Sequence, residues 1–302
     1  MNNVLIIGGL GFIGHHLARQ LQDDFFNVTI VDNCAPYTDK ATYQQRKAIV
    51  EDITTINMNV TDVRATDFAT SQQTVVHLGS YPNIKEIEEN PSLGISSLTH
   101  GVFHSIELAR HMGARRFVYS SSSMVYGDFQ QDPCPEDHPR NPQSIYGIYK
   151  KAAEDLVKAR CEQYGIDWTI IRPIAVYGPR DNNKRVVSKF FALAKQGLEL
   201  PVRGGNTLDA TYVDDTVQGF VCAVKSENSN LTANISAGTS VSLQDIAQGV
   251  IDTVGSGNIM LLPRDPLYPH RGALDISVAR SQLGYEPKYQ LLDGLKAYDN
   301  VY

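Results

Sequence analysis

The sequence predicts an α/β protein, a doubly wound parallel sheet with a smaller α/β lobe at its C-terminal end. Short apolar runs alternate with segments of helical spacing as far as residue 172, a pattern typical of strand–helix–strand units. The runs are continuously apolar, as expected for strands covered on both faces. Beyond residue 172, Pro173, Pro179 and Pro201 divide the chain into shorter pieces, which indicates the separate lobe.

Each element follows from a local pattern. Five apolar runs are expected to be buried strands, at 4–7, 28–32, 74–78, 116–120 and 168–172. Residues 12–22 and 97–113 have helical spacing, and Gly113 suits the end of the second helix. In the lobe, Ser242 is expected to cap the start of another helix.

Composition excludes several classes of protein. The 302 residues are 42% hydrophobic and 20% charged, which is ordinary for a soluble globular protein. A formal net charge of -6 argues against nucleic acid or an anionic membrane as the main partner. We expect no membrane span and no signal peptide, because the apolar runs are short and the N-terminal segment lacks a basic leader. The four cysteines lack CxxC spacing, which favours free thiols, a cytoplasmic location and no metal site.

A glycine-rich turn follows the first predicted strand. Gly8, Gly11 and Gly14 have the spacing GxxGxxG and open a helix. Glycine permits a tight turn and close approach to a pyrophosphate, which the helix N-terminus then binds. Asp32 ends the second strand, where a carboxylate accepts from ribose hydroxyls and repels a 2′-phosphate. This context predicts a Rossmann-type fold that binds NAD rather than NADP, and disfavours an incidental glycine turn with a surface aspartate.

A second pattern concerns proton transfer. Tyr146 and Lys150 in "YGIYK" are four residues apart and so share a helix face. A lysine ammonium lowers the pKa of a neighbouring phenol, so this tyrosine is a candidate general base. Tyr43 and Lys47 have the same spacing, and the pattern alone does not separate the two pairs. The serine run in "YSSSSMVYG", at a predicted strand end, favours Tyr146 because a hydroxyl there would hold the substrate oxygen.

These motifs together resemble a known family. With "NVTDV", "VVHL", "IIRPIAVYGPRD", "YVDD" and "DISVARSQLGYEP" in the same order, the chain resembles the extended short-chain dehydrogenase/reductases, of the NAD-dependent epimerase/dehydratase kind that acts on nucleotide sugars. The resemblance runs over nearly the whole chain. It implies an NAD-binding Rossmann domain at 1–172, joined by parts of 210–237, and a mainly substrate-binding lobe at 173–302.

The resemblance also implies roles for individual residues. Ser122 matches the family's catalytic serine or threonine, Tyr146 its base, and Lys150 the partner of the base. The implied cofactor contacts are Gly8, Gly11, Phe12, Ile13, Gly14, Asp32, Asn33, Asp62, Val63, Leu78, Gly79, Ser80, Tyr146, Lys150 and Pro173. The implied substrate contacts are Ser122, Ser123, Tyr146, Arg203, Arg264 and Arg271.

The chain departs from the family pattern at three places. Dehydratases and decarboxylases carry an acidic residue just after the catalytic serine, whereas this chain has Ser123 and Met124, which disfavours both reactions. An arginine that holds the diphosphate in epimerases is Leu208 here, and an asparagine of the fourth helix is Leu98. The arginines that would replace the one missing at 208 are Arg203, Arg264 and Arg271.

The sequence therefore favours a nucleotide-sugar epimerase acting at C4 with bound NAD. A keto-sugar reductase using NAD(P) or a hydroxysteroid-type dehydrogenase remains an alternative, as does a catalytically silent NAD-binding protein. The resemblance further implies a homodimer through helices at 92–112 and 145–163. Four apolar residues of these helices suit either core or interface, namely Leu98, Val102, Ile106 and Leu156.

Overall fold

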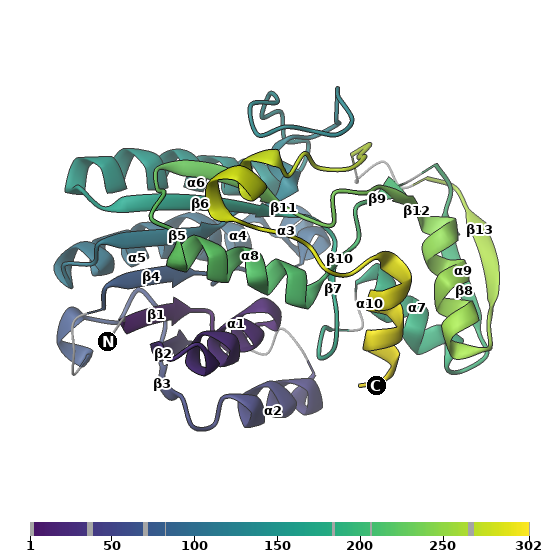
Figure 1. The fold of residues 1–302 in the computed structure, drawn as a ribbon, viewed down its shortest axis with the longest axis horizontal. Helices are drawn as coiled ribbons and strands as arrows, with labels where there is room; N and C mark the ends of the chain where they lie inside the picture. Colours follow the sequence, from purple (N-terminus) through teal and green to yellow (C-terminus); the bar gives the residue numbers. More distant parts are fainter. Residues whose placement is uncertain are drawn as a thin grey trace.

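The computed structural model contains a seven-stranded sheet with every neighbouring pair parallel (Figure 1). The model describes residues 3–34, 39–68, 72–81, 83–182, 185–205, 207–264 and 269–301. The strand order is β11-β6-β5-β4-β1-β2-β3. The strands span β1 Asn3–Ile7, β2 Asn27–Asp32, β3 Thr54–Asn57, β4 Thr74–His77, β5 Arg116–Ser120, β6 Asp167–Pro173 and β11 Leu231–Ile235. The predicted doubly wound α/β fold is confirmed.

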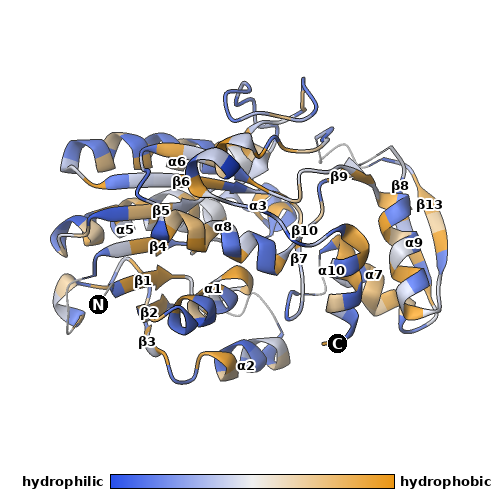
Figure 2. Ribbon diagram, in the orientation of Figure 1, coloured by the Kyte–Doolittle hydropathy of each residue, from blue (hydrophilic) through white to orange (hydrophobic). Residues whose placement is uncertain are grey.

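Helices cover both faces of the sheet, which is why its strands are continuously apolar. In β1, Val4 and Ile6 pack toward α1 and α8, whereas Leu5 and Ile7 pack toward α5 and α6. Figure 2 accordingly shows β1 in the hydrophobic colour. The helices span α1 Phe12–Asp23, α2 Lys40–Ile49, α5 Gly101–His111, α6 Ile145–Tyr164 and α8 Val213–Lys225.

The helix predicted at 97–113 begins earlier than expected. It starts with α4 at Pro91–Ile95, continues through a π-helical turn at Ser96–His100 and ends in α5. Proline suits the first helical position because its missing N–H has no partner there, and this makes Pro91 a start signal. Gly113 adopts a φ of 65°, the left-handed conformation that commonly ends helices.

The C-terminal lobe contains three two-stranded sheets and helices, and it lies beside the edge where the parallel strands end (Figure 1). Its strand pairs are β7 Val176–Tyr177 with β10 Thr211–Tyr212, β8 Glu199–Arg203 with β13 Asn258–Leu262, and β9 Thr207–Leu208 with β12 Val241–Ser242. Its helices include α7 Val186–Ala194, α9 Leu243–Val254 and α10 Leu291–Asp299. Ser242 caps α9 as predicted, since its hydroxyl accepts from the Asp245 N–H at 3.0 Å.

One segment returns from the lobe to the large sheet. Helix α8 packs against α1, and β11 pairs with β6 in the register Ala233 to Ile171. Residues 213–235 therefore lie with the sheet even though the chain enters the lobe before them.

Among the described residues, every helix falls short of the length and apolarity that a membrane crossing requires. The four cysteines Cys34, Cys134, Cys161 and Cys222 carry no disulfide.

Candidate active site

A cavity of about 1340 Å³ lies along the carboxyl ends of the parallel strands and continues between the sheet and the lobe. Its position follows from the strand order. The sequence order of the strands reverses between β1 and β4, and ligands of doubly wound sheets bind outside the strand ends at such a switch point. Residues from both sides line the cavity, from Gly8 and Asp32 to Arg203 and Arg271.

The glycine turn forms the wall of this cavity at the end of β1. Gly8 has a φ of 82°, and a Cβ there would lie 2.6 Å from the Gly79 backbone nitrogen. A Cβ on Gly14 would lie 2.3 Å from the Gly8 carbonyl oxygen. Both positions therefore require glycine. The resulting turn exposes the backbone at the start of α1, which fits the pyrophosphate of a dinucleotide.

Asp32 faces this turn from the end of β2. Its Oδ2 accepts from the Leu10 N–H at 3.0 Å, and its Oδ1 accepts from the Cys34 N–H at 2.8 Å. Burial raises the pKa of Asp32, while these two backbone hydrogen bonds and the Arg46 charge oppose the rise. A carboxylate oxygen accepts more than one hydrogen bond, so Asp32 retains capacity for ribose hydroxyls. The residues present therefore fit a dinucleotide.

Most of the predicted cofactor contacts line the cavity together. The lining includes Gly8, Gly11, Phe12, Ile13, Gly14, Asp32, Asn33, Leu78, Gly79, Ser80, Tyr146, Lys150 and Pro173. Asp62 and Val63 are not among the lining residues, and 58–61 occupy that wall instead. The chain turns at this point, with the Asp62 N–H donating to the Asn59 carbonyl at 3.0 Å, so the first part of "NVTDV" faces the cavity.

The three predicted catalytic residues meet at the end of β5. Ser122 follows this strand, and its hydroxyl lies beside the Tyr146 phenol, whose pKa it lowers. Tyr146 lies in the first turn of α6, whose N-cap Ser144 accepts from the Gly147 N–H at 3.1 Å. Lys150 follows one turn later, and its Nζ donates to the Ser120 carbonyl at 2.7 Å. The Nζ atom also lies 5.8 Å from the centre of the Tyr146 ring.

Burial dominates the ionisation of these groups. It lowers the pKa of the Lys150 ammonium to about 7, against the opposing charge of Glu154. It also raises the pKa of Tyr146, although the Arg185 charge and the neighbouring Ser122 hydroxyl act in the other direction. The expected lowering of the Tyr146 pKa by Lys150 is therefore wrong for the protein alone. Desolvation outweighs the nearby charges, and the cation that favours the phenolate is Arg185.

Two of the arginines that line the cavity were not predicted from the sequence. Arg185 precedes α7 and forms an ion pair of 3.4 Å with the buried Asp181. Arg46 on α2 is buried, and its Nε and Nη2 donate to the Arg180 carbonyl at 2.9 and 2.7 Å. Neither belongs to a recognisable motif. Their placement depends on how the loop after β7 folds over the glycine turn.

The second tyrosine–lysine pair lies elsewhere in the cavity. Tyr43, on α2, lies near Cys34 and Asp32, close to the glycine turn. Lys47 is exposed on the same helix. The structure therefore brings only Tyr146, of these two tyrosines, next to the serine run.

The three arginines proposed for the diphosphate do not all lie at the cavity. Arg203 and Arg271 line the cavity, whereas Arg264 is not among its described lining residues. Arg203 Nη1 donates to the Pro263 carbonyl at 3.3 Å, and Arg271 Nη1 lies 3.7 Å from the Met124 sulfur. Leu208, at the position of the missing arginine, is buried in the cavity wall.

Comparison with known proteins agrees with this geometry. The model of the NAD dependent epimerase/dehydratase family matches residues 4–236. UDP-glucuronic acid decarboxylase 1 from Xenopus tropicalis is 32% identical over 97% of this chain and 70% of its own length. A putative UDP-glucose 4-epimerase from Methanocaldococcus jannaschii is 28% identical over 98% of this chain and 97% of its own.

Solved structures show the same fold. UDP-glucuronic acid 4-epimerase from Bacillus cereus, in complex with UDP-glucuronic acid and NAD, superposes with a TM-score of 0.92 at 24% identity, over 99% of this chain and 98% of the other. UDP-glucose 4-epimerase from Thermotoga maritima, with UDP-glucose, gives 0.91 at 26% identity over the same shares. The family match covers most of the chain, and the chain belongs to the NAD-dependent epimerase/dehydratase family.

Proposed function

We propose that this protein is a nucleotide-sugar 4-epimerase that works with NAD. The observation that carries the proposal is the meeting of Ser122, Tyr146 and Lys150 in the same cavity as the glycine turn. Residues 1–172, with parts of 210–237, would bind the cofactor, and 173–302 would mainly bind the sugar nucleotide. The four free cysteines suit a reducing compartment, so we place the enzyme in the cytoplasm.

In this mechanism the catalytic residues act on the 4-hydroxyl of the sugar. Tyr146 takes the proton from the sugar 4-hydroxyl, and Ser122 holds that oxygen during the transfer. Lys150 is fixed by its bond to the Ser120 carbonyl one turn from Tyr146, and Arg185 is the cation that favours the phenolate form of Tyr146. Bound NAD would supply the reversible hydride acceptance that inversion at the sugar carbon requires, and the glycine turn and Asp32 would hold it. Tyr146 then returns the proton to the oxygen.

Decarboxylation is less well supported, although the decarboxylase from Xenopus tropicalis is more identical to this chain than the putative epimerase from Methanocaldococcus jannaschii. The family's decarboxylases place an acid after the catalytic serine. Ser123 and Met124 provide no carboxylate there, and the Met124 sulfur faces Arg271.

One experiment distinguishes epimerisation from the two remaining alternatives, net reduction of a keto-sugar and NAD binding without catalysis. Purified protein is incubated with a panel of nucleotide sugars and the products are identified by NMR. Steady NADH consumption would support a reductase, and NAD binding without turnover would support a silent protein.

The base is tested by Tyr146→Phe, which removes only the phenolic oxygen. We expect kcat to fall by a factor of about 10² to 10⁴, because a positioned general base contributes about that much. Ser122→Ala should cost less, since Ser122 orients the oxygen and does not take its proton. Tyr164→Phe, at the far end of α6, is the matched control and should retain native turnover. Near-native kcat in Tyr146→Phe would contradict the mechanism.

Cofactor choice is tested by Asp32→Ala. The native protein should bind NAD much more tightly than NADP, because the Asp32 carboxylate accepts from ribose hydroxyls and repels a 2′-phosphate. The variant should bind NAD more weakly, and its affinities for NAD and NADP should differ less than those of the native protein. Calorimetric titration of both proteins measures this. A native protein that binds NADP as tightly as NAD would exclude the assignment.

The diphosphate is assigned to the cavity arginines. Replacing Arg271 or Arg203 by alanine should raise KM more than it lowers kcat, because the diphosphate is remote from the reacting carbon and its binding is largely uniform. Arg264→Ala, outside the described lining, should have the smaller effect. Arg280→Ala is the control, since Arg280 pairs with the exposed Glu286 at 2.9 Å. Unchanged KM in both cavity variants would refute this assignment.

We also propose a homodimer with two-fold symmetry through α4–α5 and α6. Leu98, Val102 and Ile106 are buried in the core and are not available for an interface. Ile95 and Ile148 are 52% and 50% exposed on α4 and α6, two helices that are in contact, so they suit a partner surface.

Ile148→Lys tests this interface, because a lysine there would have to be desolvated on association. Light scattering at micromolar concentration should give a dimer mass for the native protein and a monomer mass for the variant. Leu261→Lys, which alters an apolar residue of the lobe that is 65% exposed, should leave the dimer intact. A native monomer would refute the proposal.

A further inference from the structure

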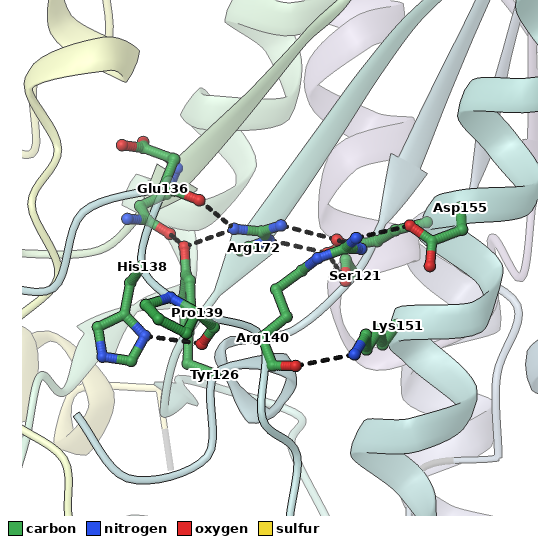
Figure 3. A network of polar contacts seen from close by, with 11 residues as sticks. Ser121, Tyr126, Glu136, His138, Pro139, Arg140, Lys151, Asp155 and Arg172 are labelled. Carbon is green, nitrogen blue, oxygen red and sulfur yellow. Dashed lines mark hydrogen bonds and ion pairs between the residues drawn. The ribbon is translucent and has the colours of Figure 1, made fainter. Parts of the chain in front are cut away.

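A buried ion pair lies immediately behind the catalytic residues. Glu154, one turn beyond Lys150 on α6, and Arg172, near the end of β6, are 0% and 2% exposed. Arg172 Nε donates to Glu154 Oε1 at 2.8 Å and Nη2 donates to Oε2 at 2.7 Å. Two further groups donate to the Glu154 carboxylate, Ser121 Oγ at 2.5 Å and Arg140 Nη1 at 3.1 Å. Figure 3 shows Arg172 and Arg140 converging beside Ser121.

The pair is tied to the strand end that carries the catalytic serine. Ser121 donates to Glu154, Ser120 accepts from Lys150, and Ser122 lies beside Tyr146. Two of these three consecutive residues are thus held by hydrogen bonds to side chains of α6, and the third faces another side chain of the same helix. The Ser121 N–H also donates to the Ile171 carbonyl at 2.7 Å, next to Arg172 in β6. A displacement of Glu154 would therefore move the segment on which Ser122 is placed.

Arg172 anchors the pair on the side away from the cavity. Its Nη1 donates to the Tyr126 hydroxyl at 2.8 Å and to the Glu136 carbonyl at 2.9 Å (Figure 3). The Tyr126 hydroxyl in turn donates to Asn234 Oδ1 on β11 at 2.7 Å. Glu154 and Arg172 are absent from the described lining of the cavity. Any influence on the reaction must therefore act through other residues.

The charge of Glu154 also reaches Lys150. In the described chain, the groups that face the Lys150 ammonium are His77 on β4, Tyr119 on β5, and Tyr146 and Glu154 on α6. Burial and the Lys150 charge lower the pKa of His77 to about 3, so His77 is neutral. The Tyr119 ring lies 5.0 Å from the ammonium and is also neutral, because burial raises its pKa. Glu154 is the group in this set that carries a negative charge.

A buried ion pair is weak evidence for stability, because desolvation offsets its attraction. We propose that Glu154 is a positioning residue of the reaction: its carboxylate, fixed by Arg172 and Ser121, keeps the buried Lys150 charged and holds the strand end that carries Ser122. The turnover part of this proposal rests on the proposed function, whereas the effect on Lys150 does not. Lys150 itself remains the group that meets Tyr146.

The experiment measures the titration of Lys150 directly. The protein is labelled with lysine carrying ¹³C at Cε, and the Lys150 resonance is assigned with Lys150→Met. Glu154→Gln removes the negative charge but leaves Arg172, so the pKa of Lys150 should fall by about one unit or more. In the double variant Glu154→Gln/Arg172→Gln both charges are absent. Its Lys150 pKa should lie between those of the native protein and the single variant.

Two controls separate charge from general damage. Glu154→Asp keeps the charge and should keep the Lys150 titration near native. Glu107→Gln removes a carboxylate that likewise pairs with an arginine of α6, Arg160, at 2.7 Å, but at the far end of the helix. It should leave Lys150 unchanged. The double variant and Glu154→Asp also test the proposal if Glu154→Gln does not fold, since neither leaves an unpaired buried arginine.

Turnover supplies the second readout. Loss of the Lys150 charge at lower pH should move the alkaline limb of the kcat profile of Glu154→Gln to lower pH by the same amount. An unchanged Lys150 titration in the Glu154 variants would overturn the proposal. Shifted titrations in a protein that epimerises no nucleotide sugar would uphold the electrostatic role and refute the proposed function instead. An equal loss of kcat at every pH, with native Lys150 titration, would reduce Glu154 to a structural residue.

Discussion

The reversal of strand order between β1 and β4 is the constraint on which the rest of the structure depends. The two strands pair in the register Ile7 to His77, and the helices α1 and α5, which come after them in the chain, cover opposite faces of the sheet. The backbones of Gly8 and Gly79 then meet so closely that a Cβ on Gly8 has no room. Because all strands of the sheet are parallel, the carboxyl ends of the other strands lie at the same edge as those of β1 and β4. The cofactor turn, Asp32 and the serine run are consequently brought to one cavity by topology, although they lie far apart in the chain.

Exclusion of water sets the chemistry of that cavity. Burial alone favours neutral Lys150, neutral His77 and neutral Tyr146. An acid–base site needs charge, so the effect of burial has to be opposed by neighbours. Two such neighbours come from different elements, Arg185 beside the phenol and Glu154 beside the ammonium. The charge state of the site is therefore a property of the assembled fold, not of the tyrosine–lysine spacing.

The sequence predicted those parts of the structure that depend on local pattern. All five apolar runs are strands because strands covered on both faces need continuous apolar sequence. β3 and β11 were not among these runs: "TTIN" is largely exposed, and "LTANI" contains Asn234, whose buried amide is satisfied by Tyr126 and by the carbonyls of Cys134 and Asp275. Arg46 and Arg185 escaped prediction for the same kind of reason, since their positions depend on loops from distant parts of the chain. Spacing likewise showed that Lys150 shares a face with Tyr146, but not that burial outweighs its charge.

Two departures from the family pattern are connected in space. The chain has Met124 where an acid stands in dehydratases and decarboxylases, and Leu208 where epimerases have an arginine. Arg271 approaches the Met124 sulfur within the same cavity whose wall contains Leu208. A carboxylate at position 124 would form an ion pair with Arg271 and neutralise it in place. A thioether accepts only weakly, so Met124 does not itself neutralise Arg271. This is one reason why we assign the anionic diphosphate of the proposed substrate to Arg271, on the side where the usual arginine is missing.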